Sequence, residues 1–235
     1  RRIAFVFFRH FVLLMATKKN KKKVLDFNMQ SQQQFAWCWA AVGTSCARFY
    51  DPESQWTQCK VASASIEPSP GNCCDAPDSL DCDKPWYLIT PNNQGSFVTT
   101  HIPSSFVTGA LPVDKLMQEI DQGRMVAYKL EITLEHALDF NIDGQEIKIP
   151  KFGHFVVIAG YESSMASPND QNVTVYVYDP FSLEKGYSTM TYEVFQTNYK
   201  CHGGAVADAN STNGIDSVTG CRVTHSFFTS PLQNA

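Results

Sequence analysis

Along this chain helical spacing comes first and strand-like runs follow, and this single change of pattern restricts the fold more than any other feature. Residues 35–64 are rich in Ala, Trp and Phe. Apolar residues recur there at intervals of three and four positions: Trp39, Val42, Cys46 and Phe49. This spacing predicts one buried helix, which ends before Asp51-Pro52 because a residue that precedes proline disfavours helical geometry.

Two further helices are predicted. Residues 54–57 can cap a short helix that runs to about Ala62. A third helix extends from about Val113 to Gln122, with Gly123 as its stop.

Strands dominate the remainder of the chain. Three runs are rich in β-branched and aromatic residues: Met125–Ile132, Gly153–Tyr161 and Val173–Tyr178. Residues 152–160 are nearly all apolar, so the second strand is expected to lie centrally, with both faces buried. Helices followed by strands predict an α+β protein with two lobes.

The distribution of charge excludes one class of partner. Eight of the 19 Lys and Arg residues lie within residues 1–23, so residues 24–235 carry 11 basic and 23 acidic groups, a net charge of −12. A nucleic-acid-binding surface needs a basic face, so no nucleic-acid partner is expected. The 43% of hydrophobic residues can fill a core and exclude a mainly disordered chain.

The first residues carry a separate signal. Two arginines precede an apolar run within residues 1–16, as in a secretory signal or a short anchor. Arg9 and His10 split this run into pieces too short to span a bilayer, so no stable membrane insertion is expected. The preferred interpretation is that the residues before Met15 are a mis-assigned start. Export is favoured if residues 1–16 are a signal, and a cytoplasmic location if Met15 is the start. Residues 18–23 are expected to form a solvated basic tail.

Eight cysteines lie at positions 38, 46, 59, 73, 74, 82, 201 and 221. None follow the Cys-x-x-Cys spacing, so a zinc site has little support and no metal is expected. In an oxidising compartment Cys59 is expected to bridge to the Cys73-Cys74 pair, whose other member bridges to Cys82 or stays free. Cys201 is expected to pair with Cys221 across a loop rich in Gly, Asn and Ser.

Cys38 is the cysteine best placed for chemistry. It lies where the polar segment 31–34 passes into the first predicted helix. A thiol at a helix N-terminus faces the positive end of the helix dipole, which favours the reactive thiolate. Cys38 is therefore the candidate nucleophile; the alternative is a small core residue between Trp37 and Trp39.

A nucleophilic thiol needs a base and a group that orients the base. Among six histidines, His154 stands out because it begins an apolar strand directly after Gly153. The next predicted strand ends in Asp179-Pro180. If the two strands pair as an antiparallel hairpin, Asp179 comes beside His154 and can hold its imidazole. Otherwise the histidine is structural and Asp-Pro marks a turn.

Acyl transfer also requires hydrogen-bond donors for the developing oxyanion. The backbone N–H of Cys38 is one candidate. The side-chain amide of Gln32, six residues earlier, is the second, although Gln33 and Gln34 leave the choice open from spacing alone.

Three separated blocks together resemble one family of enzymes. They are Gln32-x5-Cys38-Trp39-Ala40-Ala41, Gly153–Tyr161 and Tyr178-Asp179-Pro180. In this order they are similar to the blocks of papain-like cysteine proteases of clan CA. The nearest resemblance is to the bacterial branch that includes the AvrRpt2-type effector proteases. Its members similarly show Trp-Cys-Trp-Ala-Ala, a Thr-Gln-Cys segment like residues 57–59 and a Cys-Cys pair like residues 73–74.

The resemblance covers about residues 30–200 and implies a cysteine endopeptidase that forms a thioester acyl-enzyme. Cys38 would be the nucleophile and His154 the base. Asp179 would orient the base, and Gln32 would serve the oxyanion hole. The substrate would be a polypeptide, no cofactor is implied, and a monomer is expected.

The resemblance also implies an α+β, papain-like fold. A helical lobe (24–110) would carry the nucleophile and pack on an antiparallel β-rich lobe (111–235), with the active-site cleft between them. Residues 1–23 would precede both lobes as a leader or mis-assigned start plus the basic tail. Residues 133–150 lie between two predicted strands and are expected to form either a flap over the cleft or a surface hairpin around residues 142–145.

Two other classes of function stay open. A non-peptidase Cys-His-Asp acyl-transfer enzyme, such as a transglutaminase-like enzyme or an amidase, uses the same order of residues. A non-catalytic binding module can use the same fold, although all four site positions are occupied in this sequence.

Overall fold

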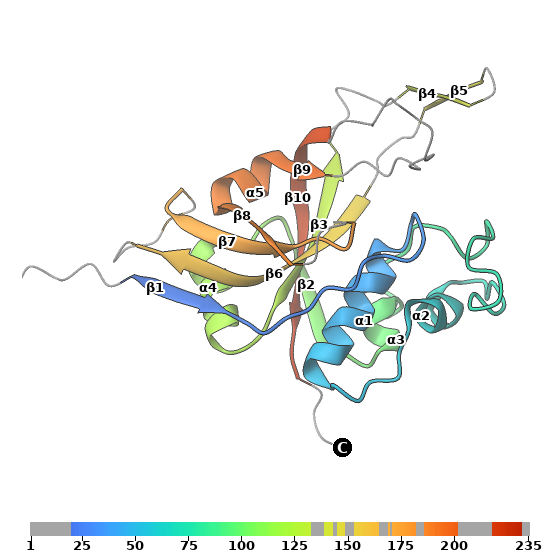
Figure 1. The fold of residues 1–235 in the computed structure, drawn as a ribbon, viewed down its shortest axis with the longest axis horizontal. Coiled ribbons are helices and arrows are strands. Elements are labelled where there is room, and N and C mark those ends of the chain that lie inside the picture. The colour runs from blue at the N-terminus through green and yellow to red at the C-terminus, as the bar shows by residue number, and fades with distance from the viewer. Residues whose placement is uncertain are drawn as a thin grey trace, which may run out of the picture.

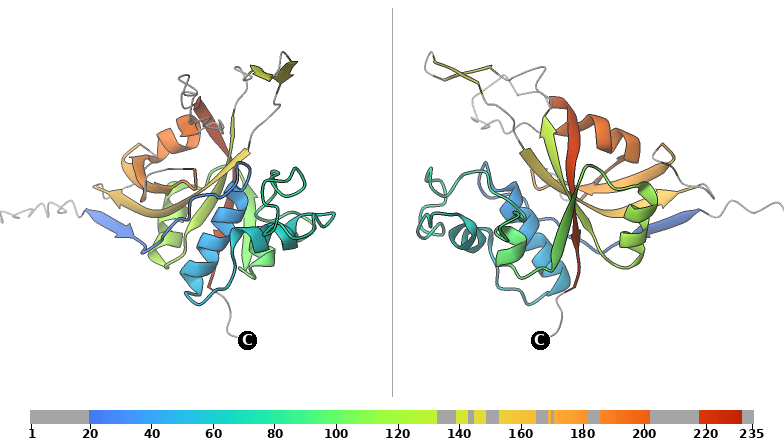
Figure 2. Two further views of the ribbon diagram at one scale, coloured as in Figure 1. Left: turned by 45° about the vertical axis from the view of Figure 1, so that its right-hand side comes forward. Right: turned by 180° about the vertical axis from the view of Figure 1, so that it is seen from behind.

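The computed structural model describes residues 20–132, 139–142, 145–148, 153–164, 169, 171–181, 186–201 and 218–231. Helices α1, α2 and α3 gather beside a group of antiparallel strands in every view (Figure 1, Figure 2). The α+β class predicted from the sequence is confirmed. The finer prediction of papain-like lobes divided near residue 110 stays a prediction.

The helices of the first group are α1 (Cys38–Tyr50), α2 (Gln58–Ser65) and α3 (Ser96–Thr99). α1 ends before Pro52 as predicted, and its residues 38–47 are all buried. α2 begins after Thr57, whose hydroxyl accepts a hydrogen bond from the backbone N–H of Lys60. A threonine in this position caps a helix start, as the sequence indicated.

The described strands other than a small hairpin form one eight-stranded antiparallel sheet. They are β1 (Lys21–Val24), β2 (Ser104–Thr108), β3 (Val126–Ile132), β6 (Gly153–Ser163), β7 (Val173–Tyr178), β8 (Ser188–Thr191), β9 (Tyr199–Cys201) and β10 (Val218–Thr229). Their order is β2-β10-β3-β6-β7-β8, with β1 beside β6 and β9 beside β10. The three predicted strands correspond to β3, β6 and β7, and β6 lies centrally as predicted.

Two more helices pack on this sheet: α4 (Val113–Asp121) and α5 (Tyr192–Asn198). α4 buries Leu116, Met117 and Ile120, and Gly123 follows it with a φ of 77°, which only glycine adopts readily. α5 packs against β3, because the ring of Phe195 meets that of Tyr128 at a centroid distance of 4.9 Å.

Residues 21–23 of the predicted solvated tail belong to β1, a strand that the sequence analysis did not predict. Lys23 of β1 pairs with Tyr161 of β6, while the side chains of residues 21–23 remain exposed. The lysine count of this segment predicted solvation of the side chains, but it does not report backbone pairing. β1 crosses β6 closely at Gly160, where a Cβ atom would lie 3.1 Å from the Val24 Cα. Residues 1–19, which carry the predicted signal or mis-assigned start, lie outside the described residues.

Strand β10 and the small hairpin lie in regions for which the sequence analysis predicted no strand or left two alternatives. β10, between β2 and β3, was not predicted, because its run from Val218 to Thr229 mixes polar and apolar residues without alternation. β4 (Asp139–Ile142) and β5 (Gln145–Lys148) form a separate antiparallel pair, which confirms the predicted hairpin. Its alternative role as a flap stays a prediction.

Of the helices in the described part of the chain, none combines the length and the apolar character that crossing a lipid bilayer requires.

Candidate active site

The sequence places Cys38 at the first residue of α1. Trp37 occupies the N-cap position and provides no side-chain cap, so the first turn of the helix has backbone N–H groups that its own side chains do not satisfy. Cys38 is a free thiol and 5% exposed. Cys46 is also free, but it is completely buried, and burial raises the pKa of its thiol far above the ordinary value. Among the cysteines whose side chains the structure describes, only Cys38 combines a free thiol with a helix start.

A short segment, Cys82–Lys84, holds the residues on either side of Cys38. The indole N–H of Trp37 donates to the carbonyl of Cys82 at 2.8 Å, and that of Trp39 donates to the carbonyl of Lys84 at 3.2 Å. The backbone N–H of Ala36 donates to the Asp83 carboxylate at 2.8 Å. These three bonds fix the start of α1 from a segment more than 40 residues away in the sequence.

Two disulfides anchor this region. Cys59 is bonded to Cys74, and Cys73 to Cys82, which confirms the pairing predicted for these four cysteines. As disulfide partners they cannot serve as thiolate ligands to zinc. Disulfides persist in oxidising compartments, so these two favour export over a cytoplasmic location. Cys221 is also disulfide-bonded, whereas the side chain of Cys201, its predicted partner, lies outside the described residues.

His154 is the second residue of β6 and points into the protein. Its backbone is held opposite Leu130 of β3, and its side chain is 2% exposed. Asp179 follows the last residue of β7 directly and is 8% exposed. β6 and β7 pair antiparallel with Val157 opposite Tyr178, which brings the start of one strand beside the end of the other. The pairing that the sequence analysis required is therefore present.

Two side chains meet at this end of the hairpin. The Nε2 atom of His154 lies 2.7 Å from Oδ1 of Asp179. The side chain of Cys38 lies close enough to the imidazole to contribute to the raised pKa of His154. Because Nε2 is engaged by Asp179, Nδ1 is the ring nitrogen that remains for the sulfur. The structure thus brings Cys38, His154 and Asp179 together in this order.

His154 and Asp179 shift each other's pKa values. Burial alone would lower the pKa of His154, but the charge and hydrogen bond of Asp179, with a contribution from Cys38, raise it to about 10. Burial alone would raise the pKa of Asp179, but His154, the backbone N–H of Phe181 and the hydroxyl of Tyr199 lower it below the ordinary value. At neutral pH the imidazole is therefore positively charged and the carboxylate negatively charged.

Tyr199 contacts Asp179 and was not identified from the sequence. Its hydroxyl donates to Oδ2 of Asp179 at 2.8 Å. The residue is 3% exposed and joins α5 to β9. No local pattern in the sequence marks it, because it is one of nine tyrosines and its partner lies 20 residues away.

Gln32 lies close to this group through its backbone. Its N–H donates to the carbonyl of Pro180 at 2.8 Å, which ties the segment before Cys38 to the residue after Asp179. Its side-chain Nε2 donates to the carbonyls of Gln34 and Phe35 at 3.0 and 2.6 Å. Its Oε1 is buried and has no hydrogen-bond partner among the described residues. Both amide hydrogens are thus engaged by the backbone, and the predicted oxyanion role stays a prediction.

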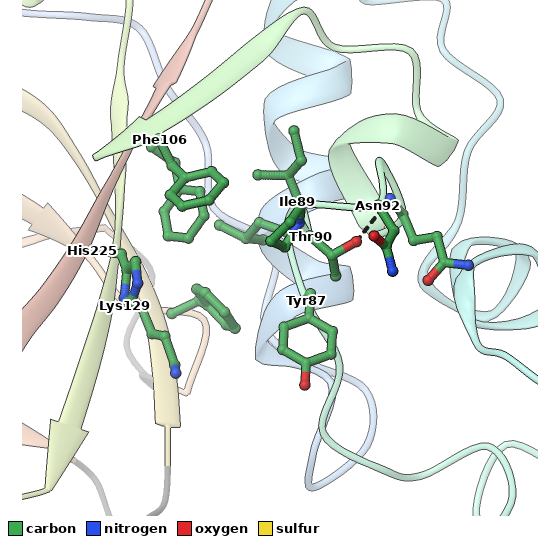
Figure 3. A pocket seen from close by; sticks show the side chains of 12 residues that line it. Tyr87, Ile89, Thr90, Asn92, Phe106, Lys129 and His225 are labelled. Carbon is green, nitrogen blue, oxygen red and sulfur yellow. Dashed lines mark hydrogen bonds between the residues drawn. The ribbon is translucent and has the colours of Figure 1, made fainter. Parts of the chain in front are cut away.

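A cavity of about 430 Å³ is lined in part by Phe155, the residue after His154, but not by Cys38, His154, Asp179 or Gln32. Figure 3 shows Phe106, Lys129 and His225 on its strand side and Tyr87, Ile89 and Thr90 facing them. Most of the lining is apolar or aromatic. The Lys129 ammonium is paired with Glu131 at 2.7 Å, and burial followed by the Lys129 charge lowers the pKa of His225. The cavity therefore offers an apolar surface with little net charge.

Chemically, the arrangement provides a sulfur nucleophile, an imidazolium that can donate a proton, and a carboxylate that holds the imidazolium. These are the components of covalent acyl transfer.

Comparison with known proteins gives a family match and matches to solved structures. No curated protein matches the sequence significantly. A crystal structure described as that of a C39-like peptidase from Bacillus anthracis is similar, with 13% identity and a TM-score of 0.46. The similarity covers 91% of this chain and 100% of the other. The model of the Peptidase_C39 like family matches residues 24–206, a range that includes Cys38, His154 and Asp179. The chain therefore belongs to the Peptidase_C39 like family, a family of cysteine peptidase type.

Proposed function

We propose that the protein is a cysteine endopeptidase that hydrolyses peptide bonds with Cys38, His154 and Asp179. The observation that carries the proposal is the buried 2.7 Å bond between His154 and Asp179, on an imidazole whose pKa the nearby Cys38 side chain also helps to raise. Membership of the Peptidase_C39 like family supports the same class of reaction.

In the first half of the reaction, the Cys38 sulfur attacks the carbonyl carbon of the scissile peptide. A C–S bond forms, and the carbonyl oxygen takes up the negative charge. The imidazolium of His154 then donates its proton to the departing nitrogen, so that the C–N bond breaks and a neutral amine leaves. The product on the enzyme is a thioester.

In the second half, the now neutral imidazole accepts a proton from water as the water oxygen attacks the thioester carbonyl. The C–S bond breaks and the peptide leaves as a carboxylic acid. The Cys38 sulfur is released as a thiolate, and the proton from water stays on His154, which restores the starting imidazolium. Asp179 stays ionised throughout and stabilises the imidazolium when it forms.

The oxyanion needs donors during both halves. The backbone N–H of Cys38 lies at the start of α1 and is one of them. For Gln32 to be the other, its amide must turn one hydrogen away from the carbonyl of Gln34 or Phe35. Substrate binding would supply that change, since the oxyanion is a stronger acceptor than a neutral carbonyl.

The substrate in this proposal is an unfolded or loop segment of polypeptide. The apolar cavity next to Phe155 takes one large apolar side chain of that segment, because Phe106, Phe155 and Phe227 line it. The finer resemblance to papain-like proteases of the AvrRpt2-type branch, with helical and β-rich lobes around a cleft, forms part of the same proposal.

The proposal is tested by hydrolysis of an unfolded protein with Cys38→Ala, using Cys46→Ala as the matched control. Cys38→Ala should abolish hydrolysis and keep the fold, because alanine is small and favours helices. Cys46→Ala should retain hydrolysis. An epoxide-type thiol inactivator should modify Cys38 alone, as mapped by mass spectrometry. Undiminished turnover in Cys38→Ala would remove the mechanism.

The same assay separates the alternative functions. Acyl transfer to an added amine, with no net hydrolysis, would indicate the non-peptidase enzyme. Tight binding of peptides, with neither hydrolysis nor labelling of Cys38, would indicate a binding module.

A further inference from the structure

The buried carboxylate of Asp179 has more partners than the imidazole alone. Its Oδ1 accepts from Nε2 of His154 at 2.7 Å and from the backbone N–H of Phe181 at 2.8 Å. Its Oδ2 accepts from the hydroxyl of Tyr199 at 2.8 Å. Tyr199 is therefore the residue that fixes the second oxygen, and with it the rotation of the carboxylate about its Cβ–Cγ bond.

Tyr199 is itself held firmly in place. Its backbone pairs with Cys221 of β10, and its ring meets that of Phe195 edge-on at a centroid distance of 5.7 Å. A buried tyrosine packs its ring in the core and needs a partner for its hydroxyl. Because the ring is fixed by strand pairing and by packing, the hydroxyl donates from a fixed position.

We propose that Tyr199 is a positioning residue of the candidate active site, whose hydroxyl holds the Asp179 carboxylate in the orientation that aligns His154 with Cys38. The inference rests on the proposed function and deepens it. Tyr199 acts through Asp179, since its hydroxyl is turned toward the carboxylate inside the protein.

The groups around Asp179 make the expected effect specific. His154 of β6 and Tyr199 of β9 face the carboxylate, Cys38 of α1 faces the imidazole, and Ser188 of β8 faces the Tyr199 hydroxyl. The hydroxyl stabilises the ionised carboxylate, so its removal should raise the pKa of Asp179 while the charges of the other groups stay the same. A tyrosine that only packs would not change this pKa.

The first test needs no enzymatic activity. In the full chain with Cys38→Ala, the titration of Asp179 is followed by NMR of its carboxyl carbon and of the His154 ring. Tyr199→Phe should raise the midpoint by roughly one pH unit, the size expected for a lost hydrogen bond to a charged group. Tyr192→Phe is the matched control, because it removes a buried hydroxyl that donates instead to the carbonyl of Leu111. Its Asp179 midpoint should equal that of the parent chain.

A second variant keeps the test valid if Tyr199→Phe does not fold. Replacement of Tyr199 by 3,5-difluorotyrosine keeps the shape of the ring and makes the hydroxyl a stronger donor. It should move the Asp179 midpoint in the opposite direction, to lower pH.

The second test measures hydrolysis of a fluorogenic peptide by the chain with Cys38 intact. Tyr199→Phe should lower kcat about tenfold and leave KM within about twofold, because the lost bond acts on the carboxylate and not on the substrate. In a chain that already carries Asp179→Ala, Tyr199→Phe should have no further effect on kcat.

Each outcome decides the question. An Asp179 midpoint unchanged by Tyr199→Phe, or moved equally by Tyr192→Phe, overturns the inference, as does a moved midpoint with an unchanged kcat. If the wild-type chain hydrolyses no peptide, the proposed function fails, and the NMR titration alone decides whether Tyr199 holds Asp179.

Discussion

His154 and Asp179 are joined by a 2.7 Å hydrogen bond from Nε2 to Oδ1, and both side chains are almost fully buried. Their opposite charges compensate each other inside the protein, where a single unpaired charge would be costly. The pair therefore determines both how the site titrates and how strongly the site depends on each partner.

Replacement of Asp179 by alanine should reduce kcat strongly. The imidazole would lose its orienting bond and its counter-charge, and loss of the orienting group in other triads costs up to about 10⁴-fold. Initial rates on a fluorogenic peptide measure the effect. Asp121→Asn is the control, because Asp121 also accepts a tyrosine hydroxyl, from Tyr161 at 2.7 Å, but belongs to α4. Equal rates for Asp179→Ala and wild type would refute the assigned role.

The activity should persist to unusually high pH. The pKa of His154 is raised from 6.5 to about 10, so the imidazolium that donates to the leaving amine remains until that pH. The alkaline limb of kcat/KM should lie near pH 10 and should move to lower pH in Asp179→Asn, which lacks the charge. A limb near the ordinary histidine value in the wild type would contradict the assigned pairing.

Stability should follow the same pair. The raised pKa of His154 contributes stability that is complete below pH 6.5 and is lost as the pH rises toward 10. The lowered pKa of Asp179 contributes stability above its ordinary value of 3.8 that is lost as the pH falls. Urea unfolding of wild type and Asp179→Ala should therefore differ most between about pH 4 and 6.5. A difference that grows above pH 7 would show the opposite linkage.

Gln32→Ala should lower kcat by about 10²-fold if the amide serves the oxyanion, as for single oxyanion donors elsewhere. Gln33→Ala is the matched control in the same segment. Equal effects of the two changes would show that this stretch acts only by holding the chain before Cys38.

The bond between Cys73 and Cys82 should affect Cys38 at a distance. Cys82–Lys84 holds Trp37 and Trp39, so removal of this disulfide with the double change Cys73→Ser and Cys82→Ser should slow alkylation of Cys38 and lower kcat. Stability should also fall by about 3 kcal/mol in the chain-entropy view of a short loop.

The control for this disulfide is the neighbouring one. The double change Cys59→Ser and Cys74→Ser should cost similar stability, because the chain-entropy cost varies only weakly between sequence separations of 15 and 9. It leaves Cys82 bonded to Cys73. Alkylation of Cys38 should then proceed at close to the wild-type rate. Identical slowing in both double variants would exclude a specific role for Cys82–Lys84.

The cavity beside Phe155 should select a large apolar side chain. In a peptide library cut by the wild type, one position relative to the scissile bond should be enriched in aromatic or large aliphatic residues. Phe106→Glu should remove the enrichment, because Phe106 lines the cavity. Val107→Glu places the same charge on the next residue of β2, which is similarly exposed and does not line the cavity, and should keep it. A library without positional preference would argue against this use of the cavity.

The sequence predicted the parts of the site that depend on local pattern. The spacing of Trp39, Val42 and Cys46 defines α1 and therefore puts Cys38 at a helix start. The apolar run after His154 and the alternating run before Asp179 define two strands that are close enough in the chain to pair. Where short-range periodicity determines an element, the prediction was confirmed.

The remainder depends on contacts between distant segments. β10 is held between β2 and β3 by partners about 90 to 125 residues away, and its own composition is mixed. β1 pairs with β6 although its lysines indicate only solvation. Tyr199 reaches Asp179 because α5 and β9 place it there, which no motif encodes. Tertiary pairing of this kind has no local signal.

The backbone bond between the N–H of Gln32 and the carbonyl of Pro180 joins the irregular segment that leads to Cys38 to the turn that follows Asp179. The bond uses only backbone atoms, so any residue could form it at these two positions, except that a proline at position 32 would lack the N–H donor. Side chains of the site can therefore change over evolutionary time while the two segments keep their relative placement. A descendant that has lost its nucleophile would inherit an intact frame, and natural selection could retain it for recognition alone.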